Sequence, residues 1–158
     1  MGTQELEQRI EEVFSLSVET ASPVSVVLLG FKHIKDHYAD KPGSWTERTA
    51  EWIANELEPG EYVSVDGPGL YWLVLPGYDR RTVGDRLQRM VADLGRQQPR
   101  QWALRQKTVH FAWGISVFPI QGAYPREHLG KAKRDLARAY TRSNPLTRDL
   151  PYEVSAAA

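Results

Sequence analysis

Two apolar runs separated by a turn sequence mark the centre of the chain. The runs are residues 62–65 and 70–75, and the sequence Asp-Gly-Pro-Gly of residues 66–69 stands between them. Proline fixes φ and glycine accepts a positive φ, which favours a type II turn over residues 67–70. Because such a turn matches the twist of a hairpin poorly, we expect a widened loop. The second run is apolar at every position, which predicts a central strand covered on both faces.

The segment before the hairpin predicts two amphipathic helices and a polar connection. Residues 3–17 repeat apolar side chains at helical spacing, with Glu and Gln on the other face, and Thr3 can cap this helix. Residues 31–39 are polar and could hold a short helix. Ser44 stands three residues before Glu47, the arrangement of a capping box, so a second amphipathic helix follows it.

The remaining segments predict three more strands and two more helices. Residues 24–30 are rich in β-branched and aliphatic side chains, and residues 102–104 and 109–118 are expected to form a strand pair. Asp79 can cap one further helix, and Pro125 suits the first turn of the last one.

The order of these elements indicates the fold class. After the first helix it is strand, helix, strand, strand, helix, strand pair and helix, which is the split βαβ arrangement of ferredoxin-like α+β folds. We therefore expect a central, mostly antiparallel sheet with helices packed on it. Residues 1–20 form an N-terminal linker helix, residues 21–142 the domain, and residues 143–158, with two prolines and small residues, a tail.

Composition narrows the classes of function. The chain has 158 residues, enough for one domain with a hydrophobic core. Lysine plus arginine equals aspartate plus glutamate at 20 each, so no overall field attracts nucleic acid or an anionic membrane. The absence of cysteine excludes disulfides, thiolate metal sites and a cysteine nucleophile. No apolar run is long enough to span a membrane, and we expect a cytoplasmic location.

Two charged groups of residues offer candidate sites of other kinds. His33 and His37 are four apart and on a helix could face one cation, with Asp36 or Asp40 supplying oxygen. No third ligand follows at a recognisable spacing, so surface histidines are the preferred interpretation and no metal is expected. The last helix is basic and could attract phosphate or an acidic partner, but in a neutral chain a solvated face is favoured. Its basic residues are Lys131, Lys133, Arg134, Arg138 and Arg142.

Over roughly residues 5–142 the chain resembles the GGDEF domain family, the diguanylate cyclases that condense two GTP into cyclic di-GMP. The family's Gly-Gly-Asp-Glu-Phe-x-x-Leu-Leu-Pro lies along residues 67–76 without a gap, and its Asp-x-Asp-x-Phe-Lys along residues 30–35. Its Ser-Ile-Gly-Val strand is similar to residues 112–117. The resemblance implies the nucleotidyl-cyclase palm fold.

The resemblance also implies that the catalytic chemistry is lost. The family's first metal-binding Asp falls on Gly30, and the Asp and Glu of its hairpin motif fall on Gly69 and Leu70, none of which can bind a cation through its side chain. Seven positions of the two motifs are degenerate: Gly30, Lys32, Gly67, Pro68, Gly69, Leu70 and Tyr71.

Positions that contact the nucleotide in the family are retained only in part. The phosphate-side lysine remains as Lys35, and a guanine-contacting carboxylate remains as Glu47, so these two could still bind a nucleotide. The guanine-contacting Asn falls on Tyr38, and the lysine of the last helix falls on Tyr140. The Arg-x-x-Asp of product inhibition falls on residues 58–61, where its first charge is reversed.

These observations predict a catalytically inactive GGDEF-like domain that serves as a regulatory or protein-interaction module in bacterial signalling. We expect no cofactor, and as partner a protein or a neighbouring domain of a longer protein, with a homodimer as a further option. Trp72 is predicted to fill the vacated nucleotide pocket. The alternative function is a module that binds GTP or a cyclic dinucleotide without turning it over. A weaker third option, nucleic-acid binding by the basic last helix, is disfavoured by the neutral chain.

Overall fold

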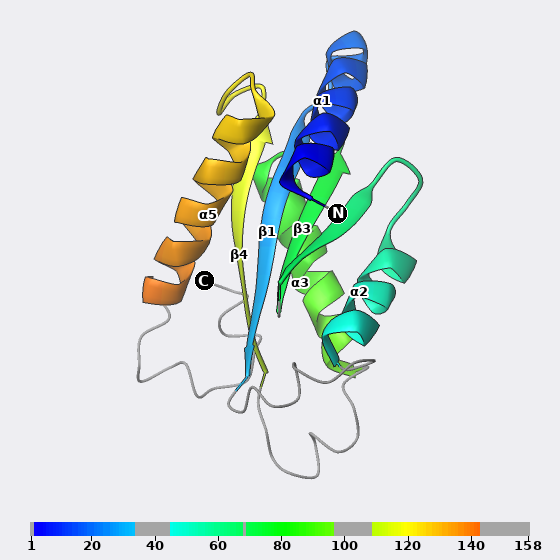
Figure 1. Cartoon of the computed structure of the whole chain (residues 1–158). Helices are drawn as coiled ribbons and strands as arrows, with labels where there is room; N and C mark the ends of the chain where they lie inside the picture. The colour runs from blue at the N-terminus through cyan, green and yellow to red at the C-terminus, as the bar shows by residue number, and fades with distance from the viewer. Residues whose placement is uncertain (1, 34–44, 68, 97–108, 143–158) are drawn as a thin grey trace.

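The computed structural model describes residues 2–33, 45–67, 69–96 and 109–142, and these residues form four helices and four strands (Figure 1). The helices are α1 (Thr3–Thr20), α2 (Trp45–Glu56), α3 (Arg80–Arg96) and α5 (Pro125–Arg142). The strands are β1 (Val24–His33), β2 (Tyr62–Gly67), β3 (Leu70–Pro76) and β4 (Val109–Phe118). The strand pair expected at residues 102–104 and the histidine pair at residues 33 and 37 fall partly or wholly outside the described residues.

The four strands form one antiparallel sheet in the order β2-β3-β1-β4. This order confirms the predicted α+β, ferredoxin-like arrangement, with β1 and β3 in the centre. Two helices cover each face: α2 and α3 lie on one face, and α1 and α5 on the other (Figure 1). The sheet is therefore the middle layer of three.

The apolar pattern of β3 explains why both faces are covered. Tyr71, Leu73 and Leu75 face α2 and α3, whereas Trp72 and Val74 face α1 and α5, and all five are buried. Successive side chains of a strand point to opposite faces, so an unbroken apolar run requires a cover on each side. The predicted central strand is confirmed.

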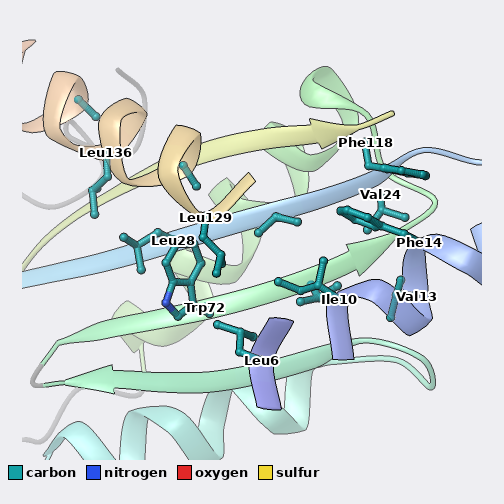
Figure 2. Close-up of a cluster of buried hydrophobic side chains, with 14 of the residues drawn as sticks. Leu6, Ile10, Val13, Phe14, Val24, Leu28, Trp72, Phe118, Leu129 and Leu136 are labelled. Carbon is teal, nitrogen blue, oxygen red and sulfur yellow. The ribbon is translucent and has the colours of Figure 1, made fainter. Parts of the chain in front are cut away.

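The core between the sheet and α1 and α5 is drawn in Figure 2. Helix α1 contributes Leu6, Ile10, Val13 and Phe14, spaced by three and four residues as a helix facing a core requires. The Phe14 ring stacks on Phe118 of β4 at a centroid distance of 3.9 Å. Helix α1 is thus held on the domain by its whole apolar stripe.

Three boundaries differ from the expectations. Strand β1 continues beyond Gly30 to His33, because β4 is long enough to pair with these residues as well; the rest of the segment 31–39, where a short helix was considered, lies outside the described residues. Helix α1 runs to Thr20 and ends where Ala21 adopts a left-handed conformation at φ 55°. Gly2, not Thr3, is its N-cap, and no side chain caps it.

Helix α3 begins as predicted. The backbone N–H of Thr82 donates to Asp79 Oδ1 at 2.8 Å, and the Asp79 N–H donates to the Thr82 hydroxyl at 3.0 Å. This reciprocal pair satisfies the first orphan donors of the helix. The hydrogen bonds from Thr82 lower the pKa of Asp79, which stays ionised at neutral pH.

Side chains cover the outward backbone groups of the second half of β4. The Ile115 N–H donates to Asp135 Oδ2 at 2.8 Å, and the Val117 N–H donates to Gln121 Oε1 at 2.9 Å. Arg80 donates to the Ile115 carbonyl at 2.9 Å and to Gln121 at 3.2 Å, and lies 3.6 Å from Asp135. An exposed strand edge invites pairing with another chain, and here these groups already have partners.

A buried histidine joins α5 to β4 and to the loop between them. His128 is fully buried, with Nδ1 2.8 Å from the Ser116 hydroxyl and Nε2 2.9 Å from the Gly122 carbonyl. Because a carbonyl only accepts, Nε2 carries the proton and the Ser116 hydroxyl donates to Nδ1. The ring also meets Phe14 edge to face at 4.9 Å. Burial lowers the pKa of His128 from 6.5, and the nearby Lys131 lowers it further.

This lowered pKa predicts a loss of stability in mild acid. In the unfolded chain the histidine takes up a proton below about pH 6.5, whereas in the folded domain it stays neutral to lower pH, so the unfolded state binds more protons. The free energy of unfolding should fall as the pH drops below about 6.5, by at most about 1.4 kcal/mol per pH unit from this group. Urea unfolding of the wild type and His128→Gln between about pH 7.5 and pH 5 measures it: the variant should be less stable at the higher pH and show a shallower decline. Parallel declines would contradict the assignment.

Candidate functional site

The hairpin between β2 and β3 is tighter than expected. Gly67 pairs directly with Leu70, which leaves two residues in the connection, and Gly69 has the positive φ of 71° that its position was predicted to need. The irregularity lies in β2 instead, where the pairing shifts between Val65 and Gly67. The expected widened loop is therefore replaced by a bulge, with Asp66 as its extra residue.

The sheet brings together the two stretches that align with the family's motifs. Gly30 of β1 pairs with Leu70 of β3 on one side and with Ala112 of β4 on the other. Positions 30 and 70, forty residues apart in the sequence, thus lie side by side at one end of the sheet. Tyr71, which aligns with the Phe of the hairpin motif, is fully buried on the opposite face.

Tyr140 of α5 occupies the space in which a side chain at position 30 would lie. A Cβ built on Gly30 would overlap the Tyr140 hydroxyl oxygen and would stand 3.1 Å from Cζ of the same ring and 3.5 Å from Leu136 Cδ2. Only glycine fits under this ring as it stands. Burial raises the pKa of Tyr140 to about 12, so the phenol stays protonated at neutral pH.

The arrangement offers apolar surface and a neutral hydroxyl where a metal site would require carboxylates. Leu70 is partly buried against the core beneath α1 and α5. Within the described residues no three His, Asp or Glu side chains gather into a group that could hold a metal ion. The residues at positions 30, 69 and 70 do not fit a divalent cation, which prefers oxygen ligands.

The remaining predicted site residues are placed less closely or fall outside the described residues. Glu47 is exposed in the first turn of α2, on the helix layer opposite Tyr140. The Lys32 backbone pairs with His110 in the sheet. Lys35 and Pro68 lie outside the described residues, as does the proposed cap Ser44. The sheet thus unites Gly30, Gly67, Gly69 and Leu70 and does not unite them with Glu47.

Trp72 is part of the buried core. It pairs with Leu28 and Ser64, is 3% exposed, and belongs to the core beneath α1, where Figure 2 shows it between Leu6, Leu28 and Leu129. That Trp72 fills a vacated pocket stays a prediction, since its pair with Leu28 is the next one along the same face from the pair of Gly30 with Leu70. Tyr140 takes up the space at Gly30; sequence reasoning placed Tyr140 at the position of the family's lysine on the last helix and did not predict this contact.

The close fit predicts coupling between positions 30 and 140. Gly30→Ala should lower the free energy of unfolding by about 1–2 kcal/mol, because the Tyr140 ring has to move. In a Tyr140→Ala background the same substitution should be neutral or stabilising, since alanine suits a strand better than glycine does. A double-mutant cycle by urea unfolding measures this change of sign. Equal effects in both backgrounds would show that the ring does not occupy the space.

A second glycine lets α5 approach the sheet. A Cβ at Gly114 of β4 would overlap backbone atoms of α5, the Ala132 carbonyl oxygen and the Leu136 nitrogen. This glycine is the one that aligns with the family's Ser-Ile-Gly-Val strand. Its role here is helix packing, and it sets the depth at which α5 presents Tyr140 to Gly30.

The segment aligned with the product-inhibition motif is engaged in internal contacts. Glu61 accepts a hydrogen bond from the Glu58 backbone N–H at 2.7 Å and forms an ion pair with Arg86 of α3. Arg86 also donates to the Glu56 carbonyl at 3.0 Å and lies over the Tyr78 ring, 5.1 Å from its centroid. The hydrogen bond with Glu61 raises the pKa of Arg86. Glu61 therefore holds α3 against the end of α2.

Comparison with solved structures supports the same fold. A sensory box/GGDEF family protein from Caulobacter crescentus superposes with a TM-score of 0.68 at 18% identity, over 89% of this chain and 92% of that one. The active GGEEF domain of a diguanylate cyclase from Vibrio cholerae gives 0.69 at 12% identity, over 88% and 90%. The chain has the fold of a GGDEF domain.

A further solved structure shares the fold, whereas the comparisons with family models and with curated proteins find no match. A GGDEF domain from Pseudomonas aeruginosa superposes with a TM-score of 0.64 at 15% identity, over 89% of this chain and 84% of that one. No protein-family model and no curated protein matches the sequence. None of the helices in the described residues has the length and apolar character needed to cross a membrane.

Proposed function

We propose that this GGDEF-like domain is catalytically inactive and serves as a regulatory or protein-interaction module in bacterial signalling. One observation carries the proposal: where the family places its first metal carboxylate, this chain has Gly30 beneath the Tyr140 ring and beside Leu70. A carboxylate is missing at position 30, and a side chain there would first have to displace the Tyr140 hydroxyl.

The chemistry of the family explains why this matters. Condensing two GTP requires divalent cations that neutralise charge at phosphorus, and such cations are held by carboxylate oxygens. The residues at positions 30, 69 and 70 provide none. A signalling protein can still use the scaffold, because a protein surface needs no catalytic carboxylate to bind a partner.

A cyclase assay tests the inactive state directly. The purified domain with GTP and either Mg²⁺ or Mn²⁺ should form no cyclic di-GMP above the blank, while an active GGEEF domain assayed in parallel should form it readily. Any product that scales with the concentration of this domain would overturn the proposal.

A nucleotide-sensing module is the second candidate, favoured by the exposed Glu47 at the start of α2 and by Lys35. Calorimetric titration with GTP and with cyclic di-GMP, each with Mg²⁺, separates the two candidates. Saturating heat at micromolar ligand that weakens at least tenfold in Lys35→Ala would favour a sensor. No heat with either ligand would favour a pure interaction module.

The partner in this proposal is another protein or a neighbouring domain of a longer protein, in the cytoplasm. Helix α1 is the segment that links the domain to such a neighbour. Its apolar stripe is buried on the sheet, so a displacement of α1 by the neighbouring domain would rearrange the core packing and transmit the change to the rest of the domain.

A further inference from the structure

Two neighbouring helices on one face of the sheet carry opposite charge. Helix α1 has five glutamates against one arginine, a net charge of −4, and α5 has six basic residues against two acidic ones, a net charge of +4. They lie on the same face, and the pair of Arg126 Nε with Glu7 Oε1 at 3.2 Å joins them. These opposite charges cancel in the net charge of the chain, but they lie on separate helices and so form separate acidic and basic surfaces.

Most of these charges point outward from the α1/α5 face. On α1 the exposed carboxylates are Glu5, Glu11, Glu12 and Glu19, and on α5 the exposed cations include Lys133, Arg134 and Arg138. Internal pairs engage only part of this set, such as Arg9 with Glu12 and Arg138 with Asp135. The face therefore presents an acidic stripe beside a basic stripe.

Exposed apolar side chains gather at one end of this face. Val18 is 66% exposed, Ile120 84% and Tyr124 70%. Helix α1 leads into β1 at the end where β4 leads into the loop before α5, and Val24 pairs with Phe118 there. This end is uppermost in Figure 1 and opposite the end that holds Gly30.

We propose that the α1/α5 face binds a second copy of this chain around a two-fold axis that runs along the helices. A half-turn about that axis places the acidic α1 on the basic α5 of the partner subunit, and does so twice. The same operation keeps the apolar ends together, so Val18 meets the loop of residues 119–124 of the partner subunit. A partner of single charge would be attracted by one stripe and repelled by the other, whereas a second copy matches both.

This inference rests on the proposed interaction role and gives that role a surface and a partner. Each helix has 18 residues and is about 27 Å long, so two helices form a face near the lower limit of specific interfaces, about 1,000 Å² in total. A weak, salt-sensitive dimer is therefore expected, because exposed ion pairs are screened by salt.

Charge reversal with rescue tests the arrangement. Glu11→Lys/Glu19→Lys brings the net charge of α1 from −4 to 0, and Lys133→Glu/Arg134→Glu brings that of α5 from +4 to 0; none of these four residues takes part in an ion pair named above. In sedimentation equilibrium at low salt the wild type should dimerise, and each variant alone should dissociate at least tenfold more readily, because both α1/α5 contacts lose their attraction. Their equimolar mixture should dimerise more tightly than either variant alone, because one α1/α5 contact of the mixed dimer keeps the wild-type charges. A wild type that stays monomeric, or a mixture no tighter than the single variants, would overturn the proposal.

An apolar pair of variants provides the matched control. Val18→Ser should weaken the dimer at low and high salt alike, whereas Leu16→Ser should leave it unchanged, because Leu16 is equally exposed at 65% but lies two residues away, on the other side of α1. Equal effects of both would overturn the assigned face. Unfolding midpoints confirm that every variant is folded. The cyclase assay on the same samples is independent: a monomer without cyclase activity overturns the dimer alone, and product formation overturns the proposed function alone.

Discussion

Gly114→Val is expected to lower the free energy of unfolding by about 3 kcal/mol or more, and the thermal midpoint by about 10 °C. The new side chain would meet the Ala132 carbonyl oxygen and the backbone of Leu136. The distance from the added Cβ to the Leu136 Cα atom would be 3.0 Å. These are backbone atoms, so no rotation of a side chain relieves the overlap and the whole of α5 has to move outward. Thermal unfolding followed by circular dichroism measures the loss.

A glycine in a different setting provides the control. Gly84 of α3 has no atom within 4 Å of an added Cβ, so Gly84→Ala should stabilise the domain by about 0.5–1 kcal/mol through the helix propensity of alanine. Opposite signs at the two glycines would confirm that contact, and not glycine content, decides the effect. A small loss for Gly114→Val would show that α5 does not press on β4.

Arg86→Ala is expected to be the second severe change, at about 3–5 kcal/mol. Its side chain is only 10% exposed and that of its partner Glu61 only 4%. Removing the guanidinium leaves a carboxylate buried without its counter-charge, and removes the hydrogen bond to the Glu56 carbonyl as well. Chemical denaturation of the wild type and the variant at neutral pH gives the difference.

Two companion variants separate the ion pair from the loss of side-chain volume. Arg89→Ala removes an exposed arginine from the same helix and should change stability by less than about 0.5 kcal/mol. Arg86→Met with Glu61→Gln removes both charges and keeps most of the volume, so it should cost clearly less than Arg86→Ala alone. If the double variant is as unstable as the single one, the lost charge is not the cause.

The fold could be predicted because the spacing of apolar residues along a short segment shows which of its faces is buried. An apolar run between turn residues showed β3 to be central, and the apolar side chains at helical spacing in residues 3–17 showed α1 to face a core. The ends of the strands and helices were harder to predict, because they depend on pairing partners elsewhere in the chain. Residues 31–33 read as polar, yet they extend β1 because β4 is there to pair with them.

The sequence predicted that the candidate site lacks the family's carboxylates, but not that the Tyr140 side chain lies over Gly30. Matching residues to a motif identifies Gly30 and Leu70, since each lies in a recognisable stretch. The contact between Gly30 and Tyr140 joins positions 110 residues apart, and no local pattern reveals it. For Trp72, its place on β3 decides that it lies beneath α1.

The fit of Tyr140 over Gly30 sets the order in which a ligand could be engineered at this end of the sheet. An aspartate introduced alone at position 30 would have to displace the end of an aromatic ring. A smaller residue introduced alone at position 140 would open the space but supply no ligand. An engineered carboxylate at position 30 therefore calls for two substitutions, and the one at position 140 comes first.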